Sequence, residues 1–256
     1  IDKWAEPDDL AWIATPDAQR IAECCAGLLL VPLGSTVDGA GHPTTVVIVE
    51  DPKALFVHLA TTFFADPTHQ EWPGVIGARV APGVVLGVSS VIRPDTIIGP
   101  NTCLAHVTVG ARVKIGANCS IGMDGFGFVR DKLGQWQRFP HFGTVVIEDD
   151  VEIGNNVTID RGALDITRIG RGTKTDDQVH VGHNCLIGQD VILTAGVVLS
   201  GGVVVGDGAW FAPNASVLEQ LRIGEHAVVG LGAVVIRDVA PHETVVGNPA
   251  HPLTKP

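Results

Sequence analysis

Hydrophobic residues recur at every sixth position over the second half of the chain. A period of six fits neither an amphipathic helix nor a strand with alternating faces. It is the hexapeptide repeat of a parallel β-helix, in which each hexad makes one short strand and one turn, and three hexads close a triangular coil of about 18 residues. We therefore predict a mainly β fold, a left-handed parallel β-helix, with the periodic residue pointing inward. The periodic positions are Ile169, Thr175, Val181, Ile187, Leu193, Leu199, Val205, Phe211, Val217, Ile223, Val229 and Val235.

The same period extends toward the N-terminus, with one slip and two insertions. Between Leu104 and Val109 the spacing shortens by one residue. Residues 123–145 break the period with Gly, Phe, Trp and Pro, so we expect a loop that protrudes from the β-helix. Residues 162–165 form a second, four-residue insertion. Long loops on repeat scaffolds are usually functional, and a tolerated surface insertion is the alternative. The earlier periodic positions are Val80, Leu86, Ile92, Ile98, Leu104, Val109, Ile115, Ile121, Ile147, Ile153 and Ile159.

Residues 1–73 lack the repeat. Apolar runs at 26–31 and 44–49 precede a stretch of helical character at 53–64, and a linker is expected at 65–73. This order of strand, strand and helix predicts a small α/β domain. The predicted division is a small α/β domain over 1–73, a β-helix domain over 74–245 and a C-terminal tail over 246–256.

Composition excludes several classes of protein. The net charge of −11 argues against a nucleic-acid partner, because binding to phosphates requires basic patches. No apolar run has the length of a membrane span, and no signal peptide is visible. The chain begins with Ile, so we expect an upstream segment to be missing or cut. Without CxxC spacing, the five cysteines predict buried thiols in a reducing, cytoplasmic compartment. They are Cys24, Cys25, Cys103, Cys119 and Cys185.

The coil length predicts which residues stack. Residues one coil apart lie about 4.8 Å apart, as neighbouring strands do. His183 follows an inward position and faces outward at a corner, with Gly201 directly above it and Glu219 one coil further on. Below it, the four-residue insertion lengthens the step and places Arg161 beneath His183, with Asp160 beside it.

A histidine beside a glycine amide suits acyl transfer to an amine. The imidazole of His183 would take a proton from the nucleophile, and the N–H of Gly201 would stabilise the tetrahedral oxyanion. Glycine also lets a thioester approach closely. The alternatives are a glycine kept for its turn and a solvated histidine. A zinc site at His180 and His183 is a further alternative, but zinc requires three ligands and no third histidine has the matching spacing, so we predict no metal.

Three motifs resemble a known family. Residues 124–128 read DGFGF, residues 158–164 read TIDRGAL, and residues 175–184 read TDDQVHVGHN. They resemble the UDP-3-O-acylglucosamine N-acyltransferases of lipid A biosynthesis, and the resemblance covers about residues 20–206. It implies a homotrimer with sites between subunits, an acyl-thioester donor and a nucleotide-linked amino sugar as acceptor. For the predicted division, it implies a nucleotide- or substrate-binding role for residues 1–73 and an acyltransferase role for residues 74–245. It also implies that His183 is the catalytic base and that Gly201 is the oxyanion glycine.

The resemblance, together with the aromatic residues of the long loop, gives the candidate substrate-binding positions. We expect the loop aromatics, including Trp136 and Phe139, to pack against a neighbouring subunit and to line the acyl or sugar cleft. Covering the end of a strand stack is the alternative. The candidates are Trp12, Asp124, Phe126, Phe128, Asp160, Arg161, Asp177, Gln178, His180 and Asn184.

The chain also departs from the family pattern. The uracil-stacking segment keeps an aromatic residue at Trp12 but has Thr15 and Ala18 where the family has Asn and Tyr. Asp177 replaces an Asn of the third motif, and a second family histidine has no match within 214–221. These differences leave uridine recognition and the identity of the sugar open.

The C-terminal part leaves the donor open. The segments 210–216 and 245–253 resemble coenzyme-A-dependent hexapeptide sugar acetyltransferases. The donor is therefore either acyl carrier protein or coenzyme A, with no covalently bound cofactor, and the alternative enzyme is a short-acyl-coenzyme-A-dependent amino-sugar N-acetyltransferase. A catalytically inactive scaffold is a third interpretation, against which stands the retention of both His183 and Gly201.

Overall fold

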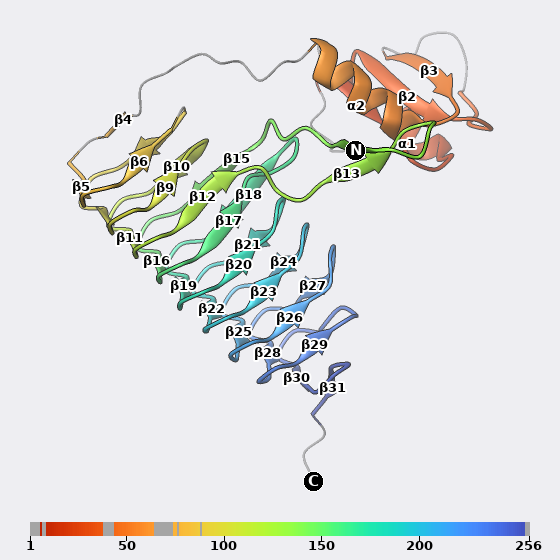
Figure 1. Ribbon diagram of the computed structural model, residues 1–256. Helices are drawn as coiled ribbons and strands as arrows, with labels where there is room; N and C mark the ends of the chain where they lie inside the picture. Colours follow the sequence, from red (N-terminus) through yellow and green to blue (C-terminus); the bar gives the residue numbers. More distant parts are fainter. Residues whose placement is uncertain are drawn as a thin grey trace. The chain divides into compact units, whose positions relative to one another are not determined.

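The chain forms two compact units. The first combines residues 1–67 with residues 127–140, and the second combines residues 68–126 with residues 141–256. A computed structural model, drawn in Figure 1, describes residues 6, 9–37, 44–63, 74–75, 77–87 and 89–253. The predicted linker at 65–73 lies outside these residues.

The first unit contains a three-stranded parallel sheet in the order β1–β2–β3. The strands predicted from the apolar runs at 26–31 and 44–49 are found as β2 and β3, and the predicted helix is found as α2. The sequence did not predict β1 or α1. The central strand is the most buried, and Asp17 caps α1 by accepting a hydrogen bond from the Arg20 N–H at 3.0 Å. The elements are β1 (Leu10–Trp12), α1 (Ala18–Ala22), β2 (Leu28–Pro32), β3 (Thr45–Val49) and α2 (Pro52–Phe63).

The segment 127–140 of the predicted loop belongs to this first unit. It forms an antiparallel hairpin of β13 (Phe128–Arg130) and β14 (Trp136–Arg138). The buried ring of Phe139 stacks on Phe56 of α2 with centroids 5.9 Å apart. Phe139 therefore packs within its own chain, and packing of the loop against a neighbouring subunit stays a prediction.

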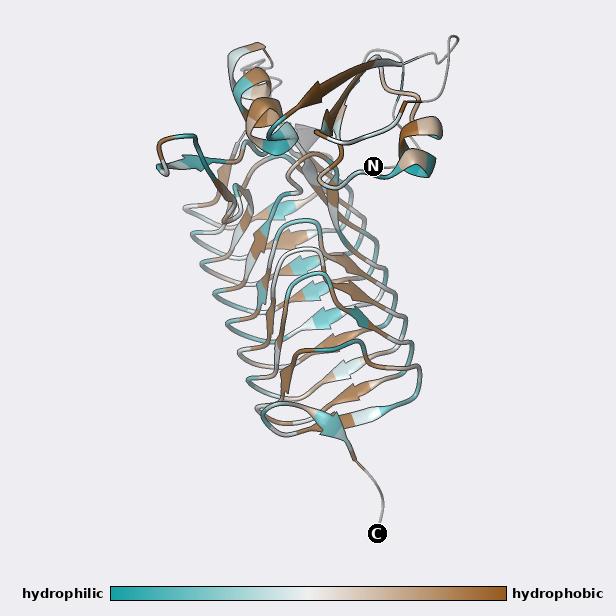
Figure 2. Cartoon of the chain, turned by 90° about the vertical axis from the view of Figure 1, so that its right-hand side faces the viewer, coloured by the Kyte–Doolittle hydropathy of each residue, from teal (hydrophilic) through white to brown (hydrophobic). Residues whose placement is uncertain are grey.

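The second unit is a parallel solenoid, and the predicted left-handed parallel β-helix is confirmed. Three sheets, parallel except for β31 at the end of one of them, form its faces, and Figure 2 shows hydrophobic segments that recur from coil to coil. The first sheet contains β4 (Gly74–Val75), β7 (Val91–Ile92), β10 (Val107–Val109), β15 (Thr144–Ile147), β18 (Ile166–Ile169), β21 (Leu186–Ile187), β24 (Val204–Val205) and β27 (Arg222–Ile223). The second contains β5 (Arg79–Val80), β8 (Ile97–Ile98), β11 (Lys114–Ile115), β16 (Glu152–Ile153), β19 (Lys174–Thr175), β22 (Ile192–Leu193), β25 (Trp210–Phe211), β28 (Val228–Val229), β30 (Thr244–Val246) and β31 (His251–Pro252). The third contains β6 (Val85–Leu86), β9 (Cys103–Leu104), β12 (Ser120–Met123), β17 (Thr158–Asp160), β20 (His180–Val181), β23 (Val198–Leu199), β26 (Ser216–Val217) and β29 (Val234–Val235).

The periodic residues form the core of the solenoid. Each of them from Ile92 to Val235 is buried, including Thr175 and Phe211. Burying one such aliphatic side chain contributes about 1.5–3 kcal/mol, so the stack of inward residues is the main source of stability. Val80 differs from the prediction and is 41% exposed, because it lies in the first coil.

The pairing register follows the coil steps expected from the sequence. Across the slip, Thr108 pairs with Val91. Across the four-residue insertion, Thr158 pairs with His180, which in turn pairs with Val198. Because β20 pairs with β23 in this register, the turn that follows β20 lies directly beside the turn that follows β23.

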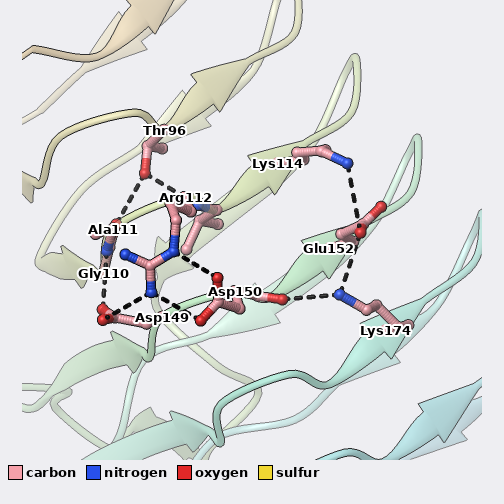
Figure 3. Close-up of polar contacts among 10 residues, drawn as sticks. Thr96, Gly110, Ala111, Arg112, Lys114, Asp149, Asp150, Glu152 and Lys174 are labelled. Atoms are coloured by element: carbon pink, nitrogen blue, oxygen red, sulfur yellow. Dashed lines mark hydrogen bonds and ion pairs between the residues drawn. The ribbon is translucent and has the colours of Figure 1, made fainter.

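Ion pairs link coils on the outside of the solenoid (Figure 3). Arg112 lies 2.6 Å from Asp150 and also pairs with Asp149, while Glu152 lies between Lys114 and Lys174 at 3.4 and 3.1 Å. The Arg112 guanidinium lowers the pKa of Asp150. All of these groups are substantially exposed, and exposed ion pairs contribute little to stability.

The structure differs from the sequence-based predictions for the C-terminal tail and for the cysteines. Within the stretch predicted as a tail, β31 pairs antiparallel with β30. All five cysteines are free, but only Cys24, Cys119 and Cys185 are buried. The prediction of a buried thiol is wrong for Cys25, which is exposed just after α1. No helix within the described residues is long and apolar enough to cross a membrane.

Candidate active site

The ring of His183 lies between two glycines. His183 is half-buried in the turn after β20, at the corner between the third and first sheets. A Cβ atom on Gly201, one coil further on, would come to 2.7 Å from both Cε1 and Nε2 of the ring. On the other side, a Cβ on Gly125 would lie 2.9 Å from the His183 Cβ. Only glycine at both positions leaves room for this ring orientation.

The backbone amide of Gly201 is available to a ligand. Its N–H donates to no oxygen within the part of the chain that the structure describes. The next amide, of Gly202, donates to the carbonyl of His183 at 2.8 Å. The structure therefore brings an imidazole nitrogen and an amide donor side by side, which is the pair that the column of stacked residues predicts.

Asn184 contacts the far side of the His183 ring. The Nδ1 atom of His183 lies 3.0 Å from Oδ1 of Asn184. The same oxygen accepts a hydrogen bond from the N–H of Ala163 at 3.0 Å. Asn184 itself has a φ of 60°, and its N–H donates to Oγ1 of Thr167 at 2.8 Å. The short insertion at 162–165 thus reaches the His183 ring through Asn184.

A second imidazole lies against the first. His141 is buried and meets the His183 ring edge-on, with centroids 5.5 Å apart and an angle of 80°. The periodicity gives no signal for His141, because it belongs to the irregular segment that returns from the long loop.

Asp160, at the end of β17, provides a carboxylate close to these rings. Burial raises its pKa and the charge of Asp124 adds to this effect, while His180 and His183 act in the opposite direction. Its carboxylate accepts no hydrogen bond from the described residues. A half-buried carboxylate without such bonds is costly, which is typical of a group kept for a ligand.

Arg161 and Asp124 form an ion pair at the base of the long loop. Nε and Nη2 of Arg161 lie 2.8 and 2.7 Å from Oδ1 of Asp124. The Arg161 side chain is only 6% exposed, and its backbone N–H donates to the Met123 carbonyl at 2.9 Å. Both are candidate substrate-binding residues, and the geometry gives them the additional role of holding the point where the loop leaves the solenoid.

The remaining candidates of the solenoid lie apart from the His183 corner. Asp177 and Gln178 occupy the turn between β19 and β20, at the opposite corner of the same face. Oδ1 of Asp177 accepts from the N–H and from Nδ2 of Asn155, at 2.6 and 3.0 Å. His180 lies on the face itself, with Nδ1 at 2.8 Å from Oγ1 of Thr158.

The aromatic candidates are divided between the two units. Phe126 belongs to the second unit and is 85% exposed. Phe128 lies in the first unit, with the Arg138 guanidinium 5.0 Å from the centre of its ring. Trp12 lies on β1 of the first unit, where Nζ of Lys53 is 5.8 Å from its ring centre.

A metal centre has no ligand set in the described part of the chain. There, no three His, Cys, Asp or Glu side chains are grouped so that they could hold a metal ion. The pair of His180 and His183 lacks the third ligand that zinc requires.

Comparison with known families points to a transferase. The model of the bacterial transferase hexapeptide (six repeats) matches residues 166–201, a stretch that includes both His183 and Gly201. Over 71 residues the chain is 55% identical to the UDP-3-O-acylglucosamine N-acyltransferase of Coxiella burnetii (strain RSA 493 / Nine Mile phase I). This matched stretch makes up 28% of this chain and 21% of that protein. Over 67 residues it is 60% identical to the enzyme of the same name from Pseudomonas syringae pv. tomato, covering 26% and 19%. The chain thus matches about a fifth of the length of these curated relatives.

Solved structures extend the likeness to most of the chain. The UDP-N-acetylglucosamine acyltransferase of Bacteroides fragilis, at 21% identity, shares the fold with a TM-score of 0.58 over 72% of each chain. The UDP-N-acetylglucosamine acyltransferase of Francisella novicida is 31% identical, with a TM-score of 0.51 over 72% of this chain and 68% of that one. The chain has the hexapeptide repeat, shares the fold of these acyltransferases and is 31% identical to one of them over most of its length. It therefore belongs to the hexapeptide-repeat acyltransferases.

Proposed function

We propose that the protein transfers an acyl group from a thioester donor, acyl carrier protein or coenzyme A, to the amino group of a nucleotide-linked amino sugar. One observation carries this proposal. Nε2 of His183 lies beside Gly201, whose N–H has no hydrogen-bond partner among the described residues. A base and an oxyanion donor are the two groups that acyl transfer to an amine requires.

The chemistry follows from this pair. The amino nitrogen of the acceptor attacks the thioester carbonyl carbon, and Nε2 of His183 takes a proton from it. The carbonyl oxygen becomes an oxyanion that accepts a hydrogen bond from the Gly201 N–H. When the tetrahedral intermediate collapses, the C–S bond breaks, and the thiolate leaves and receives the proton from the imidazolium. The products are an amide and a free thiol.

Asp160 is suited to binding the acceptor. A carboxylate with no hydrogen bond from the described residues can accept one from the amino group and hold it near His183. A sugar amine often arrives as an ammonium ion, and the negative charge of Asp160 attracts that form.

The first unit offers features that suit a nucleotide. Trp12 presents an aromatic ring, and Lys53 places a positive charge within 5.8 Å of the ring centre. An aromatic face can stack on a base and an ammonium group can pair with a phosphate. We assign nucleotide binding to this unit on that basis.

A homotrimer belongs to the same proposal. His183 lies at a convex corner of the solenoid, and a single corner cannot enclose a substrate. Cyclic assembly of identical subunits creates equivalent clefts at each interface. Three clefts, each lined by the His183 corner of one subunit, would complete the sites.

The proposal is tested by measuring transfer from both donor classes. Purified protein is incubated with UDP-linked amino sugars and with acyl carrier protein or coenzyme A thioesters, and products are weighed by mass spectrometry. We expect His183→Ala to lower kcat about a hundredfold or more, because the general base is lost. His226→Ala is the matched control, since His226 lies at an exposed corner of another coil. Equal turnover of His183→Ala and wild type, or no transfer from either donor, would contradict the proposal.

A second measurement identifies the accepting atom. Treating the product with hydroxylamine cleaves an ester but leaves an amide intact. The curated relatives are N-acyltransferases, which supports the amide. Release of the newly transferred acyl group by hydroxylamine would show that a hydroxyl group is the acceptor.

A further inference from the structure

The orientation of the Asn184 side chain is fixed by a backbone group. The Ala163 N–H points at this amide from 3.0 Å, and a backbone N–H can only donate. The atom that faces it must therefore be the oxygen, Oδ1, and not the NH2 group. The same oxygen lies 3.0 Å from Nδ1 of His183.

This contact decides where the imidazole carries its hydrogen. An amide oxygen only accepts hydrogen bonds, so Nδ1 of His183 must donate to it. In the neutral ring the other nitrogen, Nε2, then keeps its lone pair. We infer that Asn184 is a positioning residue that holds His183 in the Nδ1–H form and so leaves Nε2, the atom beside Gly201, as the base.

The consequence for catalysis rests on the proposed function, whereas the placement of the hydrogen does not. A histidine side chain in water favours the opposite form, with the hydrogen on Nε2. In that form the nitrogen beside Gly201 could not accept a proton from an amine. Asn184 thus selects the form that acyl transfer requires.

Several features hold Asn184 in place. Its φ of 60° is in the left-handed region, which asparagine tolerates better than most residues. Its N–H donates to Oγ1 of Thr167 at 2.8 Å. The Ala163 N–H comes from the four-residue insertion at 162–165, which gives that insertion a function: it supplies the donor that orients the amide.

Other charged and titratable groups surround the ring. His141 meets it edge-on, and Asp160 interacts with its charge. The ion pair of Asp124 and Arg161 and the imidazole of His180 are the next groups around Asp160. The substitutions below leave all of these residues unchanged, so a shift in the pH profile reports on Asn184.

The main variant is Asn184→Gly, compared with Asn214→Gly. Glycine adopts a positive φ without strain, so the variant removes the acceptor and spares the backbone. Asn214 has a φ of 59° at a corner of another coil and serves as the matched control. We expect Asn184→Gly to lower kcat about ten- to hundredfold with little change in KM, since an orienting partner and not a substrate contact is lost. The control should keep the wild-type kcat.

Asn184→Asp is the conservative variant. A carboxylate at this position still accepts from Nδ1–H, so activity at high pH should be retained. Its negative charge also stabilises the imidazolium, so the acid limb of the kcat/KM profile should move to higher pH. A profile identical to that of the wild type would speak against a contact between this side chain and the ring.

The decisive measurement is the 15N spectrum of protein labelled in its histidine rings, in which His183 is assigned by the signals that disappear in His183→Ala. We expect Nδ1–H in the wild type and a shift toward Nε2–H in Asn184→Gly. An Nε2–H form in the wild type, or an unchanged form in Asn184→Gly, overturns the inference, and the first of these results needs no variant to fold. If the form shifts as expected but the wild type transfers no acyl group, the inference stands and the proposed function fails.

Discussion

At the scale of single residues, the space beside the His183 ring is set by Gly201. A Cβ at this position would lie 2.7 Å from two ring atoms, so Gly201→Ala must displace the imidazole. We expect kcat to fall about a hundredfold, as for other small displacements of catalytic groups. Gly230→Ala is the control, because its Cβ would meet the Val246 side chain at the same 2.7 Å, away from His183. The prediction fails if both variants have the same kcat, measured with saturating donor.

Asp160 gives a prediction about pH. Burial raises its pKa in the folded state, so the folded protein holds this proton more tightly than the unfolded chain does. The resulting stabilisation is present below the ordinary pKa of 3.8 and is lost as the pH rises through the raised value. At neutral pH the ionised carboxylate therefore lowers the stability of the fold.

Asp160→Asn removes this cost. Calorimetry should show a higher melting temperature than the wild type at neutral pH, and a difference that shrinks as the pH falls and the wild-type carboxylate takes up its proton. The same variant should lose transferase activity if Asp160 binds the acceptor. A melting temperature that is lower at neutral pH would mean that the carboxylate has a stabilising partner.

At the scale of elements, the hairpin of β13 and β14 is held to α2 by stacked rings. Phe56 is 4% exposed and Phe139 is 9% exposed. Replacing either by Ala should destabilise the first unit by about 3 kcal/mol or more in denaturant titrations. The double variant should show a coupling of about 0.5–1.5 kcal/mol, because the rings contact each other. Phe126→Ala should leave this stability unchanged, since that ring is 85% exposed.

The sequence predicts those elements whose pattern is long enough to detect. The hexads identify the coils, and the fixed coil step places Gly201 on His183 before any coordinate is known. β1 and α1 are too short for a periodic signal, and the pairing of Phe139 with Phe56 joins residues far apart in the chain. His141 was missed because no repeat runs through its segment. The role of Asn184 depends on which atom faces Ala163, which a sequence does not contain.

At the scale of the whole molecule, the proposed trimer predicts a mass. Light scattering should give three times the chain mass of 26.8 kDa, because the His183 corner needs a neighbouring subunit to form a cleft. Dilution that dissociates the assembly should lower the specific activity in parallel. A monomer at working concentration that retains full activity would rule out a shared site.

The strand pairing of the solenoid has a further consequence. Each coil is hydrogen-bonded to the coils directly above and below it, so its stability is close to a sum of nearest-neighbour terms, and opening spreads inward from the ends. The amides of Gly182 and Gly202, which donate to Leu199 and His183, belong to interior coils. Deuterium should therefore enter the backbone near Arg79 and Thr244 well before it replaces those two hydrogens. His183 and the Gly201 amide, which form the proposed site, therefore lie in the coils that open last.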